Sequence, residues 1–123
     1  MKFDKLSNQV IACELEVHRN LGPGLLETTY EQCLAYELKQ KNILFKLQYS
    51  LPVKYKTIKL DCGYRVDVLV ENKLILELKS IEIVLPIHEA QILTYMKLAN
   101  IKTGLLINFN VRKLKEGLKR YVL

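Results

Sequence analysis

DVLVENKLILELKS, residues 67–80, is the most informative stretch of this sequence, because it reads as two apolar strands joined by a polar turn. Three ionisable residues interrupt this apolar pattern: Asp67, Glu77 and Lys79. Side chains of this kind are rarely buried unless they are paired or take part in chemistry. The stretch therefore predicts both the middle of a sheet and a candidate site.

The length of the turn between these strands determines which side chains share a face. A two-residue turn at 71–72 places Asp67 opposite Leu76 and sends Glu77 to the other face. A loop one residue longer places Asp67 opposite Glu77, and its asparagine tolerates the left-handed conformation that such loops use. Lys79 then shares the face of Glu77, because side chains alternate along a strand. The apolar residues expected on the opposite face are Val66, Val68, Leu76 and Leu78.

In the longer register, the two carboxylates and the lysine have a clear chemical use. Carboxylates about 5 Å apart repel each other unless a cation lies between them, and Mg²⁺ or Mn²⁺ takes such oxygen ligands. The metal can polarise a phosphodiester and lower the pKa of a water, while Lys79 orients that water or neutralises the phosphate. The alternative is an ordinary salt bridge among strand residues, since E-x-K recurs by chance.

Apolar residues at helical spacing predict three helices. The first covers residues 5–20 and ends at Gly22-Pro23-Gly24. The second runs to about Lys41, with Asn42 as a left-handed cap, and its expected apolar stripe is Leu26, Tyr30, Leu34 and Leu38. The third begins at Pro86 and runs through Asn100, and its expected buried stripe is Ile92, Met96 and Ala99.

Alternating and continuous apolar runs predict the strands. Residues 45–55 alternate, with Pro52 requiring an edge position or a bulge, and residues 58–60 would extend the sheet. Strands at 64–70, 74–79 and 103–109 follow, and a turn at Glu116-Gly117 precedes a short strand over 118–122. This order predicts a central mixed sheet covered by helices, in a single domain spanning 1–123.

Composition bounds the class of protein. The 123 residues carry a net charge of +6, which makes nucleic acid a candidate partner. No apolar run approaches the roughly 20 residues that span a bilayer, so no membrane partner is expected. Three cysteines outside any CxxC pair indicate a reducing, cytoplasmic setting. Neither a G-x-S-x-G turn nor a phosphate-cradling glycine loop occurs, which argues against serine hydrolases and nucleotide-driven motors.

Two further features add to the candidate site. Gln91 and Tyr95 are four residues apart and so lie on one face of the third helix, and His88 continues that line. Glu27 lies near the start of the second helix. The alternatives are an ordinary amphipathic helix and a carboxylate that favours the helix dipole.

At these residues the chain resembles a known family. Gly24-Leu-Leu-Glu27-Thr-Thr-Tyr30 matches the motif of the GxxExxY family of small bacterial proteins, which is similar to the PD-(D/E)XK nuclease superfamily. The resemblance assigns Asp67 to the first acidic position, Glu77-Leu78-Lys79 to (D/E)xK, and Gln91 with Tyr95 to QxxxY. Glu27 matches an acidic residue on the helix before the sheet, whereas Val66 stands where the motif has proline.

The resemblance implies an α/β (α+β) fold with a three-layer core, in which helices flank a mixed sheet of about four to five strands. It implies a metal-dependent nuclease that cuts DNA and sometimes RNA, and the choice between DNA and RNA stays open in the sequence. The implied ligands of Mg²⁺ (or Mn²⁺) are Asp67, Glu77, the Leu78 carbonyl and Glu27. The implied catalytic residues are Asp67, Glu77, Lys79, Gln91 and Tyr95, with His88 near the phosphate or at the surface. The alternative is a catalytically inactive nucleic-acid-binding or accessory module of the same fold.

Basic residues would hold the substrate through its phosphates. The candidates are Lys54, Lys56, Arg112, Lys113, Lys115, Lys119 and Arg120, and a solvated surface is the alternative for each of them. The sequence has no zinc finger, basic recognition helix or evident aromatic platform, so sequence-specific readout is not predicted. Target choice would come from a partner protein or from a homodimer.

Overall fold

The computed structural model describes residues 3–123. Its helices are α1 (Lys5–Leu21), α2 (Glu27–Gln40), α3 (Pro86–Ala99) and the short 3₁₀ helix η1 (Leu114–Gly117). Its strands are β1 (Phe45–Ser50), β2 (Val53–Tyr55), β3 (Ile58–Leu60), β4 (Arg65–Val70), β5 (Leu74–Lys79), β6 (Thr103–Asn108) and β7 (Leu118–Val122).

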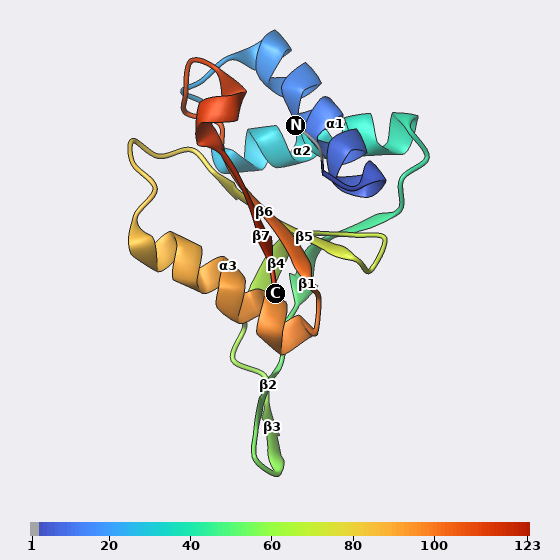
Figure 1. The fold of residues 1–123 in the computed structure, drawn as a ribbon, viewed down its shortest axis with the longest axis vertical. Coiled ribbons are helices and arrows are strands. Elements are labelled where there is room, and N and C mark those ends of the chain that lie inside the picture. Colours follow the sequence, from blue (N-terminus) through green and yellow to red (C-terminus); the bar gives the residue numbers. More distant parts are fainter. Residues whose placement is uncertain (1–2) are drawn as a thin grey trace.

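A five-stranded mixed sheet in the order β1-β4-β5-β6-β7 forms the middle layer. β5 and β6 run parallel, joined by α3, and the other neighbours are antiparallel. Helices α1 and α2 cover one face of the sheet and α3 covers the other (Figure 1). The predicted three-layer α/β architecture is therefore confirmed.

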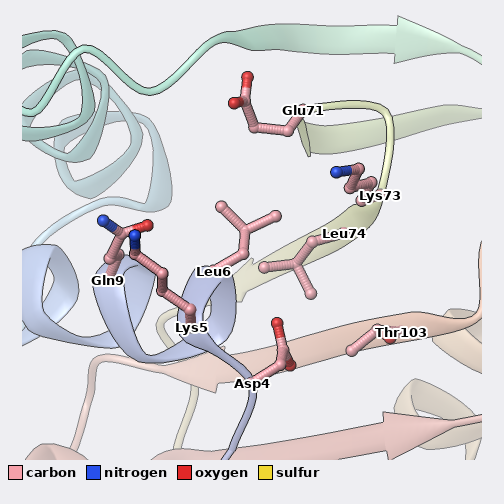
Figure 2. Close-up of a pocket in the computed structure, with 8 residues that line it drawn as sticks. All are labelled: Asp4, Lys5, Leu6, Gln9, Glu71, Lys73, Leu74 and Thr103. Carbon is pink, nitrogen blue, oxygen red and sulfur yellow. The ribbon is translucent and has the colours of Figure 1, made fainter.

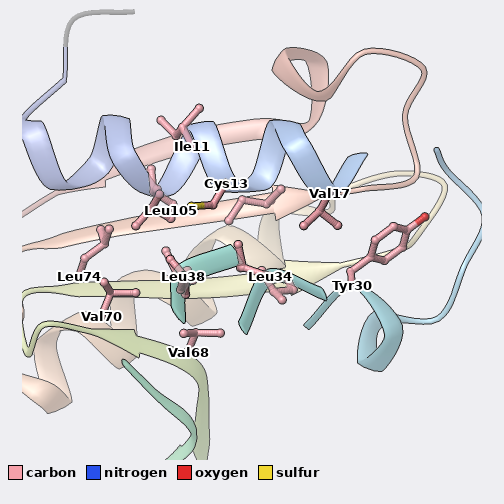
Figure 3. Packing of buried hydrophobic residues seen from close by; sticks show 14 of the residues in the cluster. Ile11, Cys13, Val17, Tyr30, Leu34, Leu38, Val68, Val70, Leu74 and Leu105 are labelled. Atoms are coloured by element: carbon pink, nitrogen blue, oxygen red, sulfur yellow. The ribbon is translucent and has the colours of Figure 1, made fainter. Parts of the chain in front are cut away.

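The apolar core divides into two clusters because side chains alternate along the strands. Val68, Leu76 and Leu78 belong to the same cluster as Tyr30 and Leu34 of α2, and Figure 3 shows Val68, Tyr30 and Leu34 in this packing. The opposite cluster, under α3, is formed by Leu51, Val66, Leu69, Ile75, Ile92, Tyr95, Met96 and Leu106. The prediction that Val66 shares the face of Val68 is wrong, since Val66 packs under α3.

Helix ends agree with local sequence chemistry. The Asp4 side chain accepts a hydrogen bond from the Ser7 amide (3.1 Å), and α1 ends at Gly22 with φ 69°. Asn42 and Asn100 have the left-handed backbone, with φ 57° and 56°. Leu26 does not join the buried stripe of α2: it precedes the helix and is 74% exposed.

The segment after β1 departs from its prediction. Pro52 cannot donate to a ladder, and the alternating segment divides there into β1 and β2. β2 and β3 pair only with each other, so residues 58–60 do not extend the main sheet. Figure 1 shows this two-stranded hairpin, residues 53–60, projecting from the body of the molecule.

The turn between β4 and β5 is the three-residue loop considered in the sequence analysis. Glu71 and Asn72 have φ 53° and 54°, and Val68 pairs with Leu76.

Near the C-terminus, η1 takes the place of the turn expected at 116–117, and the strand over 118–122 is confirmed. In the described part of the chain, no helix has the length and apolar character needed to cross a bilayer.

Candidate functional site

The candidate site lies where β4 and β5 separate. Their ladder stops at the pair Val68–Leu76, one pair before Asp67 and Glu77. Beyond it, each carboxylate accepts a hydrogen bond from the backbone of the other strand. The Asp67 amide donates to Glu77 Oε2 (2.9 Å), and the Leu78 amide donates to Asp67 Oδ2 (2.8 Å). The two acids thus lie side by side and join the strands in place of ladder bonds.

Burial first, and then the negative charge of Asp67, raise the pKa of Glu77 to about 8. Lys79 acts in the opposite direction, since its ammonium favours the charged form of Glu77. The Glu77 side chain is only 4% exposed, whereas Asp67 and Lys79 are half-buried. An electrostatically unfavourable pair of acids therefore borders solvent beside one lysine.

A buried asparagine holds the backbone that follows Lys79. Asn108 lies beside Lys79 in the parallel ladder of β5 and β6. Its side chain accepts a hydrogen bond from the Ile81 amide (3.1 Å) and donates one to the Ile81 carbonyl (2.9 Å). Sequence reasoning did not select Asn108, because it lies 27 residues from Ile81 in an apolar strand.

The polar line predicted on α3 lies next to the two acids. Gln91 Nε2 donates to Tyr95 Oη (3.1 Å). The pKa of Tyr95 is raised by burial first and then by the charge of Glu77, which indicates that the phenol lies near that carboxylate. His88 lies at the start of α3, where its Nδ1 accepts a hydrogen bond from the Leu85 amide (2.9 Å). His88 thus caps the helix.

Glu27 has a different environment from the two acids. Its Oε2 accepts a hydrogen bond from the Ser80 amide (3.2 Å), the residue after Lys79, and Ser80 Oγ donates to the Leu25 carbonyl (2.6 Å). The start of α2 is therefore connected to the end of β5. Across residues 3–123, no group of three or more His, Cys, Asp or Glu side chains is placed to hold a metal ion.

Sequence reasoning missed two residues beside Asp67. Gln48 Nε2 donates to Glu31 Oε1 (2.6 Å) and lies 3.4 Å from Asp67 Oδ1. Glu31 is buried, and its pKa is raised by that burial and also by the charge of Asp67. Gln48 has φ 49° within β1, a left-handed conformation that is costly for a residue with a β-carbon. The only sequence signal for Gln48 was its polar side chain at an outward-facing position of an alternating strand.

The basic residues predicted to contact phosphates occupy several surfaces. Lys54 and Lys56 lie on the projecting hairpin, Arg112 and Lys113 lie between the end of β6 and η1, and Lys115 lies in η1. β6 runs parallel to β5, so this second group lies at the end of the sheet that carries Lys79. Lys119 and Arg120 form ion pairs with Glu89 and Asp4.

A cavity of about 560 Å³ lies at the opposite end of β5, where the strand begins at Leu74 (Figure 2). Two of its acids already stabilise local structure. Asp4 accepts hydrogen bonds from Ser7 and Arg120, and the bond from the Ser7 hydroxyl makes the largest contribution to lowering its pKa to about 2. Glu71 accepts a hydrogen bond from the Leu44 amide (3.1 Å). This cavity lacks the paired acids found at the other end of the sheet.

One of the comparisons with known proteins finds a match. The family model of the PD-(D/E)XK nuclease superfamily matches residues 4–121, which is nearly the whole chain. No curated protein and no solved structure matches the chain. The matched span contains the sheet, the two joined acids of β4 and β5, and the Gln91–Tyr95 pair of α3. The chain belongs to the PD-(D/E)XK nuclease superfamily.

Proposed function

We propose that this protein is a nuclease that hydrolyses phosphodiester bonds in nucleic acid, with DNA preferred to RNA, and that it depends on Mg²⁺ or Mn²⁺. Membership of the superfamily supports a nuclease-like activity. The observation that carries the metal dependence is the pair of mutual hydrogen bonds that holds Asp67 against Glu77 beside Lys79.

The donor set fits a hard divalent cation. Two carboxylates lie in contact, one of them buried, and the pKa of Glu77 is raised by burial and then by its neighbour. A cation between the carboxylates would remove their mutual repulsion. Their oxygens would act as its ligands, and this coordination would compensate the hydration that the carboxylates lose on burial. Mg²⁺ is commonly held by one or two carboxylates, with the remaining positions taken by water and substrate phosphate. A pair of acids without a third is therefore sufficient for this role.

Each residue of the candidate site has a separate task in this proposal. Asp67 and Glu77 would hold the cation with the Leu78 carbonyl, and Glu27, which the structure does not group with them, would reach it through a water. When bound there, such a cation would supply polarisation of the phosphodiester and a lowered pKa of a water. Lys79 Nζ donates a hydrogen bond to the attacking water or to the phosphate oxygens, where negative charge develops.

The residues around this centre position it. Gln91 and Tyr95 act as a hydrogen-bonded unit, directing an amide and a phenol toward the phosphate or toward Lys79. Glu31 positions Asp67 through Gln48, whose amide lies between the two carboxylates. His88 stabilises the first turn of α3, where its ring accepts a hydrogen bond from the Leu85 amide, and it lies at the edge of the site.

The test is incubation with circular DNA, linear DNA and RNA in Mg²⁺, Mn²⁺ or EDTA. Wild type is expected to cut only when Mg²⁺ or Mn²⁺ is present. The cutting rates of Asp67→Asn and Lys79→Ala are each expected to fall by about a hundredfold or more. Lys73→Ala is the matched control, because Lys73 is exposed in the turn at the far end of β5. It should cut as wild type does.

Two outcomes would reject the proposal. Binding of nucleic acid that falls with salt, without cutting in any metal, would favour the inactive binding module. Cutting that persists in EDTA, or that survives both Asp67→Asn and Lys79→Ala, would place the chemistry elsewhere in the molecule.

A further inference from the structure

A groove lies between the root of the hairpin and helix α3, next to the paired acids. Its volume is about 490 Å³, within the range of roughly 300–1,000 Å³ that is typical of sites for small organic groups. Apolar and aromatic side chains form most of its wall, among them Val53, Tyr64, Ile87 and Leu98. None of these residues has a task in the proposed cleavage.

Two tyrosines distant in sequence meet in this groove. The rings of Tyr64 and Tyr95 lie 6.2 Å apart at 57°, an arrangement that favours aromatic contact, and Tyr64 is 44% exposed. His88 and Gln91 also line the groove, so hydrogen-bonding groups border the aromatic wall. An exposed aromatic ring with polar groups at its edge suits a flat, partly polar ring such as a nucleobase.

The groove shares Tyr95 and Gln91 with the candidate cleavage site. Tyr95 lies in its wall, and the charges of Glu77 and Asp67 both raise the pKa of that tyrosine, after burial. β4 begins at Arg65 and β5 ends at Lys79, and these strands are antiparallel, so the hairpin leaves the sheet at the end that carries Lys79. A base in the groove would belong to a nucleotide adjacent to the phosphate being cut.

Charge on the hairpin matches an anionic backbone. Lys54 and Lys59 lie directly opposite each other in the β2–β3 ladder, and like charges in such pairs are destabilising. None of the ion pairs found among residues 3–123 includes them. Phosphates passing along the hairpin would compensate this repulsion.

We infer that this groove binds an unpaired nucleobase of the nucleic-acid strand, and that the protein therefore favours single-stranded or frayed substrates over fully paired duplex. The inference rests on the proposed nuclease function for the identity of the strand. A base can enter only after leaving its stack, and this costs least where it is already unpaired. Tyr64 is the residue on which the base stacks.

Binding of labelled oligonucleotides in EDTA tests the groove without cleavage. We compare an ordinary single strand with one of the same length that carries abasic sites, using fluorescence anisotropy. Wild type should bind the ordinary strand roughly tenfold more tightly, as expected for stacking of one base. Tyr64→Ala should lose this preference and leave binding of the abasic strand unchanged. Tyr64→Phe should keep the preference, since its ring remains.

Tyr36→Ala is the matched control, because Tyr36 is an exposed tyrosine on α2, 61% accessible and remote from the groove. Equal affinity of wild type for both strands, or equal effects of Tyr64→Ala and Tyr36→Ala, would overturn the inference. If the protein instead self-associates and Tyr64→Ala abolishes that association, the groove is a protein interface and the inference is wrong.

The outcome is separable from that of the proposed function. Metal-dependent cutting without base-dependent binding would leave the nuclease and remove the nucleobase site. Base-dependent binding that is lost in Tyr64→Ala, without cutting in any metal, would leave the nucleobase site and remove the nuclease.

Discussion

Glu14 in α1 and Glu77 in β5 are the two least exposed carboxyl residues of residues 3–123, at 0% and 4% exposure. Burial is the first cause of a raised pKa in both. Their surroundings nevertheless differ. Neither oxygen of the Glu14 carboxyl group has a hydrogen-bond partner, whereas Glu77 Oε2 accepts one from the Asp67 amide. A second acid and an ammonium stand beside Glu77, and only Glu77 belongs to a set of groups that a cation would complete.

The difference teaches how to interpret a perturbed carboxyl group. Burial alone makes the neutral form of Glu14 favourable and costs folding free energy whenever the group is charged. The same burial beside Asp67 and Lys79 creates a place where an added cation lowers the energy. A raised pKa therefore selects candidates, and the neighbouring charges separate a functional group from a structural one.

The largest expected effect is on cleavage. Glu77→Gln should lower metal-dependent cutting by at least about a hundredfold, because it removes one of two charged ligands and even outer-shell changes cost 10–100-fold. Glu14→Gln should cut as wild type does. The measurement is the initial rate on linear DNA in Mn²⁺, with thermal unfolding to verify that both variants fold. Equal losses in the two variants would remove the distinction between these acids.

The next effect is on stability. Glu14→Leu should raise the free energy of unfolding by about 1–3 kcal/mol, because it removes a buried polar group without partners. The folded-state pKa of Glu14 is raised above 4.5, so the wild-type protein loses stability as pH rises from there through the folded-state pKa. The gain from Glu14→Leu should therefore be larger near pH 8 than near pH 5.

Denaturant unfolding at several pH values measures this gain. Glu16→Gln is the control, since the Glu16 side chain, two positions away, is 42% exposed and its partners are Arg19 and Asn20. It should change stability little at any pH. A gain in Glu14→Leu that does not depend on pH would show that the carboxyl group is charged or paired in solution.

A smaller effect is expected at Gln48, which supports Asp67 from β1. Gln48→Ala and Gln48→Gly should each weaken Mn²⁺ binding by about tenfold, because the amide between Glu31 and Asp67 is lost. Gln48→Gly should be more stable than Gln48→Ala by about 1 kcal/mol, since glycine adopts φ 49° without strain. Calorimetric titration and thermal unfolding measure the two effects. Identical stability of the two variants would mean that this backbone is not strained.

The strands and the register that brings Asp67 beside Glu77 could be predicted from sequence, because both depend on local rules. Side chains alternate along β5 and along β4 from Val68 onward, and a loop with a left-handed asparagine sets their register. The helix boundaries follow from Gly22, Pro86 and Asn100 for the same reason.

The missed features depend on tertiary structure. Val66 changes face just beyond the point where the β4–β5 ladder stops and the two acids replace its bonds. Gln48 reaches Glu31 and Asp67 through an unusual backbone conformation that no local pattern signals. Tyr64 and Tyr95 meet only because the hairpin turns away from the sheet beside α3, so the aromatic surface was not evident in sequence.

Calorimetric titration of Mn²⁺ tests the paired acids most directly. It is carried out near pH 8, which is about the pKa of Glu77, on wild type, Asp67→Asn, Glu77→Gln and Glu14→Gln. We expect one bound ion in wild type and in Glu14→Gln with equal affinity, and at least about tenfold weaker binding in the other two. Equal binding by all four proteins, or none by folded wild type, would contradict a cation site at Asp67 and Glu77.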